Sequence, residues 1–174
     1  LFETIRIIEE MNIKPKVVLW ENVKGVLDRN LRASFFHYLK EMERLGYENK
    51  YEILNAIEFG IPQKRERIFV VSILENNPFD FVKLEKTQAR DISEFLEKDA
   101  SNLYEVRQES ILRYIRGEPK NNNFRGRLKV IDKFAYTIST KQVRIPNSGI
   151  IDLGNGKYRY LTERECFRLM GFDD

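Results

Sequence analysis

Hydrogen-bond donors recur at every second position between residues 63 and 67. They are Gln63, Arg65 and Arg67, and an apolar run at residues 69–73 follows. In an extended segment side chains alternate between two faces, so all three donors project on one side, away from Lys64 and Glu66. Their spacing of roughly 7 Å is close to the distance between neighbouring phosphates of a nucleic-acid strand. A guanidinium group can also form two parallel hydrogen bonds to a phosphate or to the edge of a base. The pattern predicts a nucleotide-binding strand, although a solvated charge run would have the same composition.

Charge is unevenly distributed along the chain. The 30 Lys and Arg residues nearly balance the 27 Asp and Glu residues, for a net charge of +3. Residues 75–100 carry four basic against seven acidic side chains, whereas residues 113–144 carry nine against two. A basic segment of that size predicts a polyanionic partner.

Scarce cysteine and histidine exclude several kinds of site. Cys166 is the one cysteine, so the chain can form neither an internal disulfide nor a cysteine-cluster zinc site, and His37 is the one histidine. No apolar run approaches the ~20 residues needed to span a bilayer, and no signal peptide is recognisable. These observations predict a cytoplasmic protein with no metal site and no membrane association.

The elements expected around the donors belong to an α/β sheet. Apolar residues recur at helical spacing through residues 1–11 and 31–45, and Gly46 ends the second helix. Between them, the wholly apolar run at residues 17–20 is typical of a strand buried on both faces. Residues 51–56 and 67–73 are expected to be antiparallel neighbours at a sheet edge. Helix, strand and helix in that order predict a piece of an α/β fold.

The character of the sequence changes after residue 74. A turn-rich segment at 75–78 introduces short irregular elements, with short helices expected at 91–96 and 110–115. Order returns near the end, where Thr162 and Glu165 form a capping-box pattern for a helix that stops at Gly171. We therefore expect a boundary near residue 75.

Three motifs occur in a fixed order along these elements. They are Glu21-Asn22-Val23, the Gln-x-Arg-x-Arg motif at 63–67, and the segment 159–172. Together, with a variable basic segment between the second and third, they closely resemble the later motifs of the DNA cytosine-5 methyltransferases. The resemblance covers nearly the whole chain, with residues 75–130 placed by position alone.

That resemblance implies a fold and a division of the chain. Residues 1–74 would be the later part of the Rossmann-like sheet of an S-adenosylmethionine-dependent methyltransferase. Residues 75–157 would be a small, irregular, β-containing target recognition domain, and residues 158–174 a buttressing helix motif that returns to the core.

The resemblance also implies roles for individual residues. In the family a cysteine thiolate adds to C6 of cytosine while an acid protonates or hydrogen-bonds N3, and Glu21 suits the role of that acid. Asn22 would order the same loop and is a candidate for binding substrate DNA. Gln63 would line the pocket for the extruded base, since the reacting atoms are stacked inside duplex DNA. Arg65 and Arg67 would hold the cytosine O2, the Glu21 loop or the flanking phosphate.

Further candidates follow from the recognition region. Thr137-Ile138-Ser139 resembles a family signature whose threonine contacts the DNA backbone near the flipped base, so Thr137 and Ser139 are candidates for DNA binding. Leu1 resembles the end of a motif that closes one side of the cofactor pocket. Candidates for phosphate or guanine contacts are Arg125, Arg127, Lys129, Lys141 and Arg144.

Some parts of a complete enzyme do not occur in this sequence. It has no Pro-Cys and no glycine-rich cofactor turn, and Cys166 lies inside the capped helix, where it does not fit the nucleophile. The resemblance therefore implies an inactive fragment of a bacterial, nucleoid-associated restriction-modification enzyme, which uses S-adenosylmethionine to methylate double-stranded DNA. A non-catalytic DNA-binding or regulatory module and an RNA-directed relative are the alternatives.

Overall fold

The chain folds into two compact units. The computed structural model describes residues 2–118, 128–140 and 146–174. The first unit comprises Leu1–Asn55 and Glu66–Glu85, and the second comprises Ala56–Arg65 and Lys86–Asp174. The chain therefore passes between units within the Gln-x-Arg-x-Arg motif, after Arg65.

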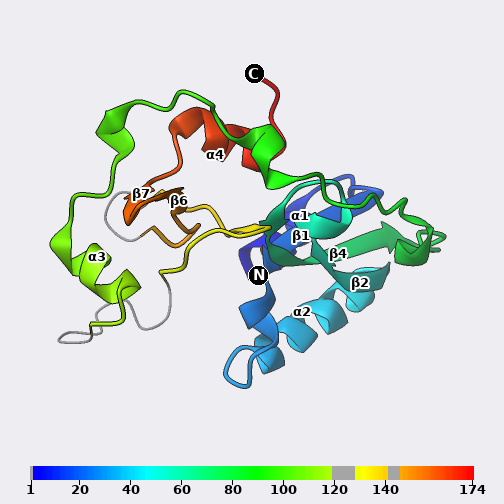
Figure 1. Ribbon diagram of the computed structural model, residues 1–174. Coiled ribbons are helices and arrows are strands. Elements are labelled where there is room, and N and C mark those ends of the chain that lie inside the picture. Colours follow the sequence, from blue (N-terminus) through cyan, green and yellow to red (C-terminus); the bar gives the residue numbers. More distant parts are fainter. Residues whose placement is uncertain (1, 119–127, 141–145) are drawn as a thin grey trace. The chain divides into compact units, whose positions relative to one another are not determined.

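A three-stranded antiparallel sheet is the centre of the first unit (Figure 1). Its strands are β1 (Val17–Val23), β2 (Tyr47–Asn55) and β4 (Glu66–Leu74). β4 lies between the other two and pairs antiparallel with both, with Val17 opposite Ile73 and Tyr47 opposite Leu74. The predicted pairing of residues 51–56 with 67–73 is confirmed.

Two amphipathic helices supply the apolar core of this unit. They are α1 (Phe2–Glu10) and α2 (Arg32–Arg44), close to the bounds predicted from apolar spacing. The buried residues of α2 recur every three or four positions, which aligns them on one face. They pack with β4 residues in one cluster that includes Phe35, Tyr38, Met42, Ile68 and Val70.

The prediction that the first strand is buried on both faces is wrong. Burial alternates along β1: Val18 and Trp20 pack against the core, whereas Val17 is 54% and Leu19 66% exposed. In the described part of the chain, β1 lies at an edge of the sheet and only one of its faces is covered. The strand also continues to Val23, so Glu21 and Asn22 lie within it.

Short elements build the second unit. Two strand pairs are present in its described residues: β3 (Gln63–Lys64) with β5 (Ala135–Tyr136), which are parallel, and the hairpin of β6 (Ile151–Gly154) and β7 (Lys157–Arg159). Its helices are α3 (Glu109–Ile115) and α4 (Glu163–Leu169). The predicted helix at 91–96 is a single 3₁₀ turn, Ile92–Phe95.

Two buried clusters stabilise this unit. One includes Phe95, Ala135 and Leu169, and the other includes Ile111 and Ile150. Among the described residues, no helix is long and apolar enough to cross a membrane. Nor, in the same residues, do three or more His, Cys, Asp or Glu side chains gather where they could hold a metal ion.

Candidate functional site

Glu21 and Arg67 form an ion pair on neighbouring strands. Val23 lies opposite Arg67 in the register of β1 and β4, so Glu21 is the diagonal neighbour of Arg67. Arg67 Nε lies 3.2 Å from Glu21 Oε1, and the side chains are 16% and 44% exposed, respectively. Arg67 Nη1 also donates to the Glu66 carbonyl at 2.8 Å. The guanidinium is thus fixed by the main chain and holds a carboxylate that stays accessible.

Asn22 bonds to the backbone of its own strand. Its Oδ1 accepts a hydrogen bond from Val23 N at 2.8 Å. This contact lies at the end of β1, beside Glu21. The predicted role of Asn22 in ordering this segment stays a prediction, and so does its contact with substrate.

Gln63 lies in the interior of the second unit. The side chain is 1% exposed. Its Nε2 donates to the Leu169 carbonyl at 2.7 Å, and its Oε1 accepts from Ile138 N at 3.5 Å. Gln63 therefore connects β3 to the end of α4 and to the segment after β5. In this structure its amide stabilises the fold, and base binding by Gln63 stays a prediction.

Arg65 lies between the two strands of its motif. It is half-buried, and its carbonyl accepts a hydrogen bond from Ala56 N at 3.1 Å. Glu66, the next residue, is exposed and pairs with Lys24 at 3.0 Å. The alternation predicted for residues 63–67 is seen in burial, since Lys64 and Glu66 are exposed and the other three are not.

Thr137 and Ser139 follow β5 directly. Thr137 Oγ1 donates to the Lys64 carbonyl at 3.1 Å, which places the threonine beside the motif strand β3. Ser139 Oγ is buried and has no hydrogen-bond partner among the described residues. The structure therefore brings Gln63, Thr137 and Ile138 together within the second unit.

A buried ion pair joins β7 to α4. Arg159 donates to both carboxylate oxygens of Glu165, at 2.7 and 2.8 Å, and Glu165 is fully buried. The same carboxylate accepts from Thr162 N at 2.9 Å and from Glu97 N at 2.7 Å. Thr162 Oγ1 accepts from Glu165 N, which completes the predicted capping box, and it donates to Glu97 Oε2 at 2.6 Å.

The buried Glu165 carboxylate thus accepts two hydrogen bonds at each of its oxygens, and no charge is left without a partner. These bonds fix α4 to β7 and to the backbone at Glu97. The sequence predicted the capping box and the motif around Arg159. It did not predict Glu97, which lies 68 residues before Glu165 and joins it only through the tertiary fold.

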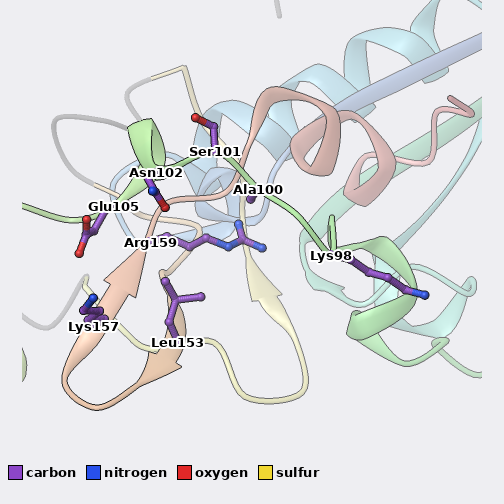
Figure 2. Close-up of a pocket in the computed structure, with 8 residues that line it drawn as sticks. All are labelled: Lys98, Ala100, Ser101, Asn102, Glu105, Leu153, Lys157 and Arg159. Atoms are coloured by element: carbon purple, nitrogen blue, oxygen red, sulfur yellow. The ribbon is translucent and has the colours of Figure 1, made fainter.

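A cavity of about 260 Å³ lies beside Arg159 in the second unit. Figure 2 shows it between the segment 98–105 and the β6–β7 hairpin, with the side chain of Lys98 pointing away from the hairpin. No sequence motif indicated it. Its lining residues are Lys98, Ala100, Ser101, Asn102, Glu105, Leu153, Lys157 and Arg159.

Several sequence candidates lie outside the described residues. These are Leu1, Arg125, Arg127, Lys141 and Arg144. Cys166, by contrast, is described, and it packs partly buried against an apolar cluster of the second unit.

One protein family matches the whole chain. The family model described as C-5 cytosine-specific DNA methylase matches residues 1–174. The chain belongs to this family. The resemblance of the three motifs to DNA cytosine-5 methyltransferases is therefore confirmed.

Two relatives of this C-5 methylase chain come from bacteria. The Type II methyltransferase M2.ScrFI of Lactococcus lactis subsp. cremoris is 36% identical, over 100% of this chain and 48% of the relative. The Type II methyltransferase M.DsaV of Dactylococcopsis salina is 31% identical, over 92% of this chain and 48% of the relative. The chain thus spans about half the length of these relatives.

Solved structures show the fold. The S. pombe Dnmt2 methyltransferase matches 99% of this chain and 60% of its own length, with a TM-score of 0.76 at 19% identity. The Entamoeba histolytica methyltransferase EhMeth matches 95% of this chain and 53% of its own length, with a TM-score of 0.71 at 20% identity. The predicted fold class is confirmed: an α/β methyltransferase sheet with a small, irregular, β-containing part.

Proposed function

We propose that this chain is part of an enzyme that transfers a methyl group from S-adenosylmethionine to C5 of cytosine in duplex DNA. The observation that carries the proposal is the Glu21–Arg67 pair, at 3.2 Å, in a member of the C-5 cytosine-specific DNA methylase family. The guanidinium holds an accessible carboxyl in a fixed position, where a base could meet it. The cytosine would be extruded from the helix to reach it.

The chemistry requires such an acid. C5 of cytosine is a poor nucleophile until a thiolate adds at C6, and that addition is easier when N3 is protonated or accepts a strong hydrogen bond. Glu21 would supply the proton or hydrogen bond at N3, and Arg67 would hold Glu21 and face the cytosine O2. The thiolate would come from a Pro-Cys segment, which these 174 residues do not contain.

S-adenosylmethionine would supply the methyl group. The cavity beside Arg159 does not fit it, because the basic side chains in its lining outnumber the one carboxylate, Glu105, and positive charge disfavours a sulfonium cation. Leu1, the position predicted to reach the cofactor, lies outside the described residues. We therefore assign no step at the cofactor to the residues described in this chain.

The similarity to bacterial Type II methyltransferases supports a restriction-modification role. In that role residues 75–157 would recognise a short target sequence, residues 158–174 would support them, and the enzyme would act on nucleoid DNA in the cytoplasm. Duplex DNA would be the partner.

Methyl transfer from tritiated S-adenosylmethionine tests the proposal. The full-length protein should label mixed-sequence duplex DNA, with the label in 5-methylcytosine, and the 174-residue chain alone should not. Transfer RNA is the competing acceptor. Labelling of RNA instead of DNA, labelling by the chain alone, or no transfer by a full-length protein that carries Pro-Cys would each contradict the proposal.

A further inference from the structure

The pairing of β3 with β5 places Lys64 beside an aromatic side chain. Gln63 pairs with Ala135 and Lys64 with Tyr136 in this parallel pair. Because strand residues alternate between faces, Gln63 and Ala135 both point into the interior and the other two lie on the opposite face. Lys64 Nζ lies 5.4 Å from the centroid of the Tyr136 ring.

A second lysine reaches the same ring from another segment. Lys129 Nζ lies 5.3 Å from the centroid of Tyr136. The backbone around Lys129 is fixed, since its carbonyl accepts from Ile150 N at 3.0 Å and Ile131 N donates to the Ile150 carbonyl at 2.8 Å. Tyr136 is fixed too, because its N–H donates to the Ser148 carbonyl at 2.8 Å. The backbone segments that carry the ring and Lys129 are therefore held in place, and the ring lies near both ammonium groups.

Neither ammonium group is neutralised by a carboxylate in the described part of the chain. Both lysines are exposed, and no Asp or Glu oxygen of the described residues forms an ion pair with either. Lys24 and Lys86, in contrast, pair with Glu66 and Glu58. Two positive charges near one ring repel each other, and cation–π attraction at an exposed site contributes only about 0.5–1 kcal/mol each. An anion near both lysines would offset this repulsion.

We propose that Lys64 and Lys129, held over Tyr136, bind backbone phosphate of the DNA substrate. The proposal rests on the proposed function and adds a contact to it. Thr137, which resembles the family threonine that touches the DNA backbone, donates to the Lys64 carbonyl at 3.1 Å, so the lysine platform lies beside that position. Ammonium groups act on phosphate as compact point charges, without base specificity.

The dependence of DNA affinity on salt tests the platform. A plot of log K for DNA binding against log salt concentration has a negative slope. In the full-length protein, Lys64→Gln and Lys129→Gln should each make this slope shallower by about 0.9, because one phosphate contact is lost. The drop in affinity between 50 and 200 mM salt should then be roughly threefold smaller for each lysine replaced. Lys64→Arg and Lys129→Arg keep the charge and should keep the slope.

Lys40→Gln is the matched control. Lys40 is exposed on α2, and its replacement removes the same charge from the first unit, so the slope should equal that of the unchanged protein. Equal slopes for Lys64→Gln, Lys129→Gln and Lys40→Gln, with normal methyl transfer to DNA, would overturn the platform and leave the proposed function intact. Methyl transfer to RNA alone would instead overturn the proposed function. A slope that falls only with an RNA ligand would assign the platform to RNA and contradict the inference.

Discussion

At the residue scale, the Glu21–Arg67 pair exists because antiparallel pairing sets the two residues diagonally on one face of β1 and β4. Glu21→Gln keeps the size of the side chain and an oxygen for Arg67, but it removes the acid. The turnover number of the full-length enzyme should therefore fall by about 10² or more. DNA affinity, measured by fluorescence anisotropy, should stay within about threefold of that of the unchanged enzyme. The substitution lies near one base and alters few phosphate contacts, which supply most of the affinity.

Glu43→Gln is the control for this prediction. Glu43 is exposed on α2 and loses the same charge, so neither turnover nor DNA affinity should change. If Glu21→Gln lowered affinity and turnover by the same factor, Glu21 would be a structural residue and the assignment of the acid would fail.

Two buried tyrosines of the first unit differ in one hydrogen bond. Tyr47 Oη donates to the Pro15 carbonyl at 2.7 Å, whereas Tyr38 Oη has no partner among the described residues. Burial, with a smaller contribution from Tyr47, raises the pKa of Tyr38 to about 12. Tyr38→Phe should thus raise the free energy of unfolding by about 1 kcal/mol, and Tyr47→Phe should lower it by about the same amount.

Tyr38 should also make the stability of the protein depend on pH in the alkaline range. The unfolded chain would ionise Tyr38 near the ordinary tyrosine pKa of 10.0, while the folded state keeps it neutral up to about 12. Above pH 10 the unfolded state therefore binds fewer protons, and stability falls as pH rises. In urea titrations at pH 9 to 11, the free energy of unfolding of Tyr38→Phe should therefore fall less with pH than that of the unchanged protein. Identical declines in both proteins would contradict this prediction.

At the element scale, local signals in the sequence predicted most helices and one strand pair. α2 at Arg32–Arg44 lies within the predicted 31–45, and the capping box of Thr162 and Glu165 is present. The β6–β7 hairpin was missed although its signal was there: Asn155 and Gly156 have φ of 52° and 73°, as a two-residue hairpin turn requires. The central place of β4 and the bonds of Glu97 depend on contacts between distant segments, which no local periodicity encodes.

Gly149 is the glycine on which the Lys129 segment depends. Its φ is +101°, and an added Cβ would lie 2.5 Å from Ile131 Cγ1 and 3.1 Å from the Lys129 carbonyl. Gly149→Ala should lower the free energy of unfolding by about 2–4 kcal/mol, from backbone strain together with overpacking. Denaturant unfolding measures this loss.

Gly154 is the matched position for this prediction. Its φ is +81°, but nothing lies within 4 Å of an added Cβ, so Gly154→Ala carries the backbone strain alone, about 1 kcal/mol. Equal losses for the two variants would show that the close approach at Ile131 does not determine stability.

At the scale of the whole molecule, contacts rather than sequence order define the two units. The sequence predicted a change near residue 75, where turn residues become frequent. Contacts assign Ala56–Arg65 to the second unit, because β3 pairs with β5 and Gln63 bonds to Leu169. These partners lie more than 70 residues from β3 along the chain, so the exchange of segments could not be predicted from local patterns. The assignment of residues 75–157 to target recognition stays a functional prediction.

Each buried cluster draws all its members from one unit. Met42 is fully buried in the cluster of the first unit, and Ile111 is fully buried in a cluster of the second. Truncating either to alanine should cost about 2–5 kcal/mol. Since the clusters share no residue, Met42→Ala should speed amide exchange in β2 and β4 while β6, β7 and α3 keep their protection, and Ile111→Ala should do the reverse. Hydrogen exchange followed by mass spectrometry separates these segments.

Equal loss of protection in all segments of both variants would contradict this prediction. It would mean that the two units unfold as one cooperative body. The segment at residues 56–65, which belongs to the second unit, would then couple their stabilities.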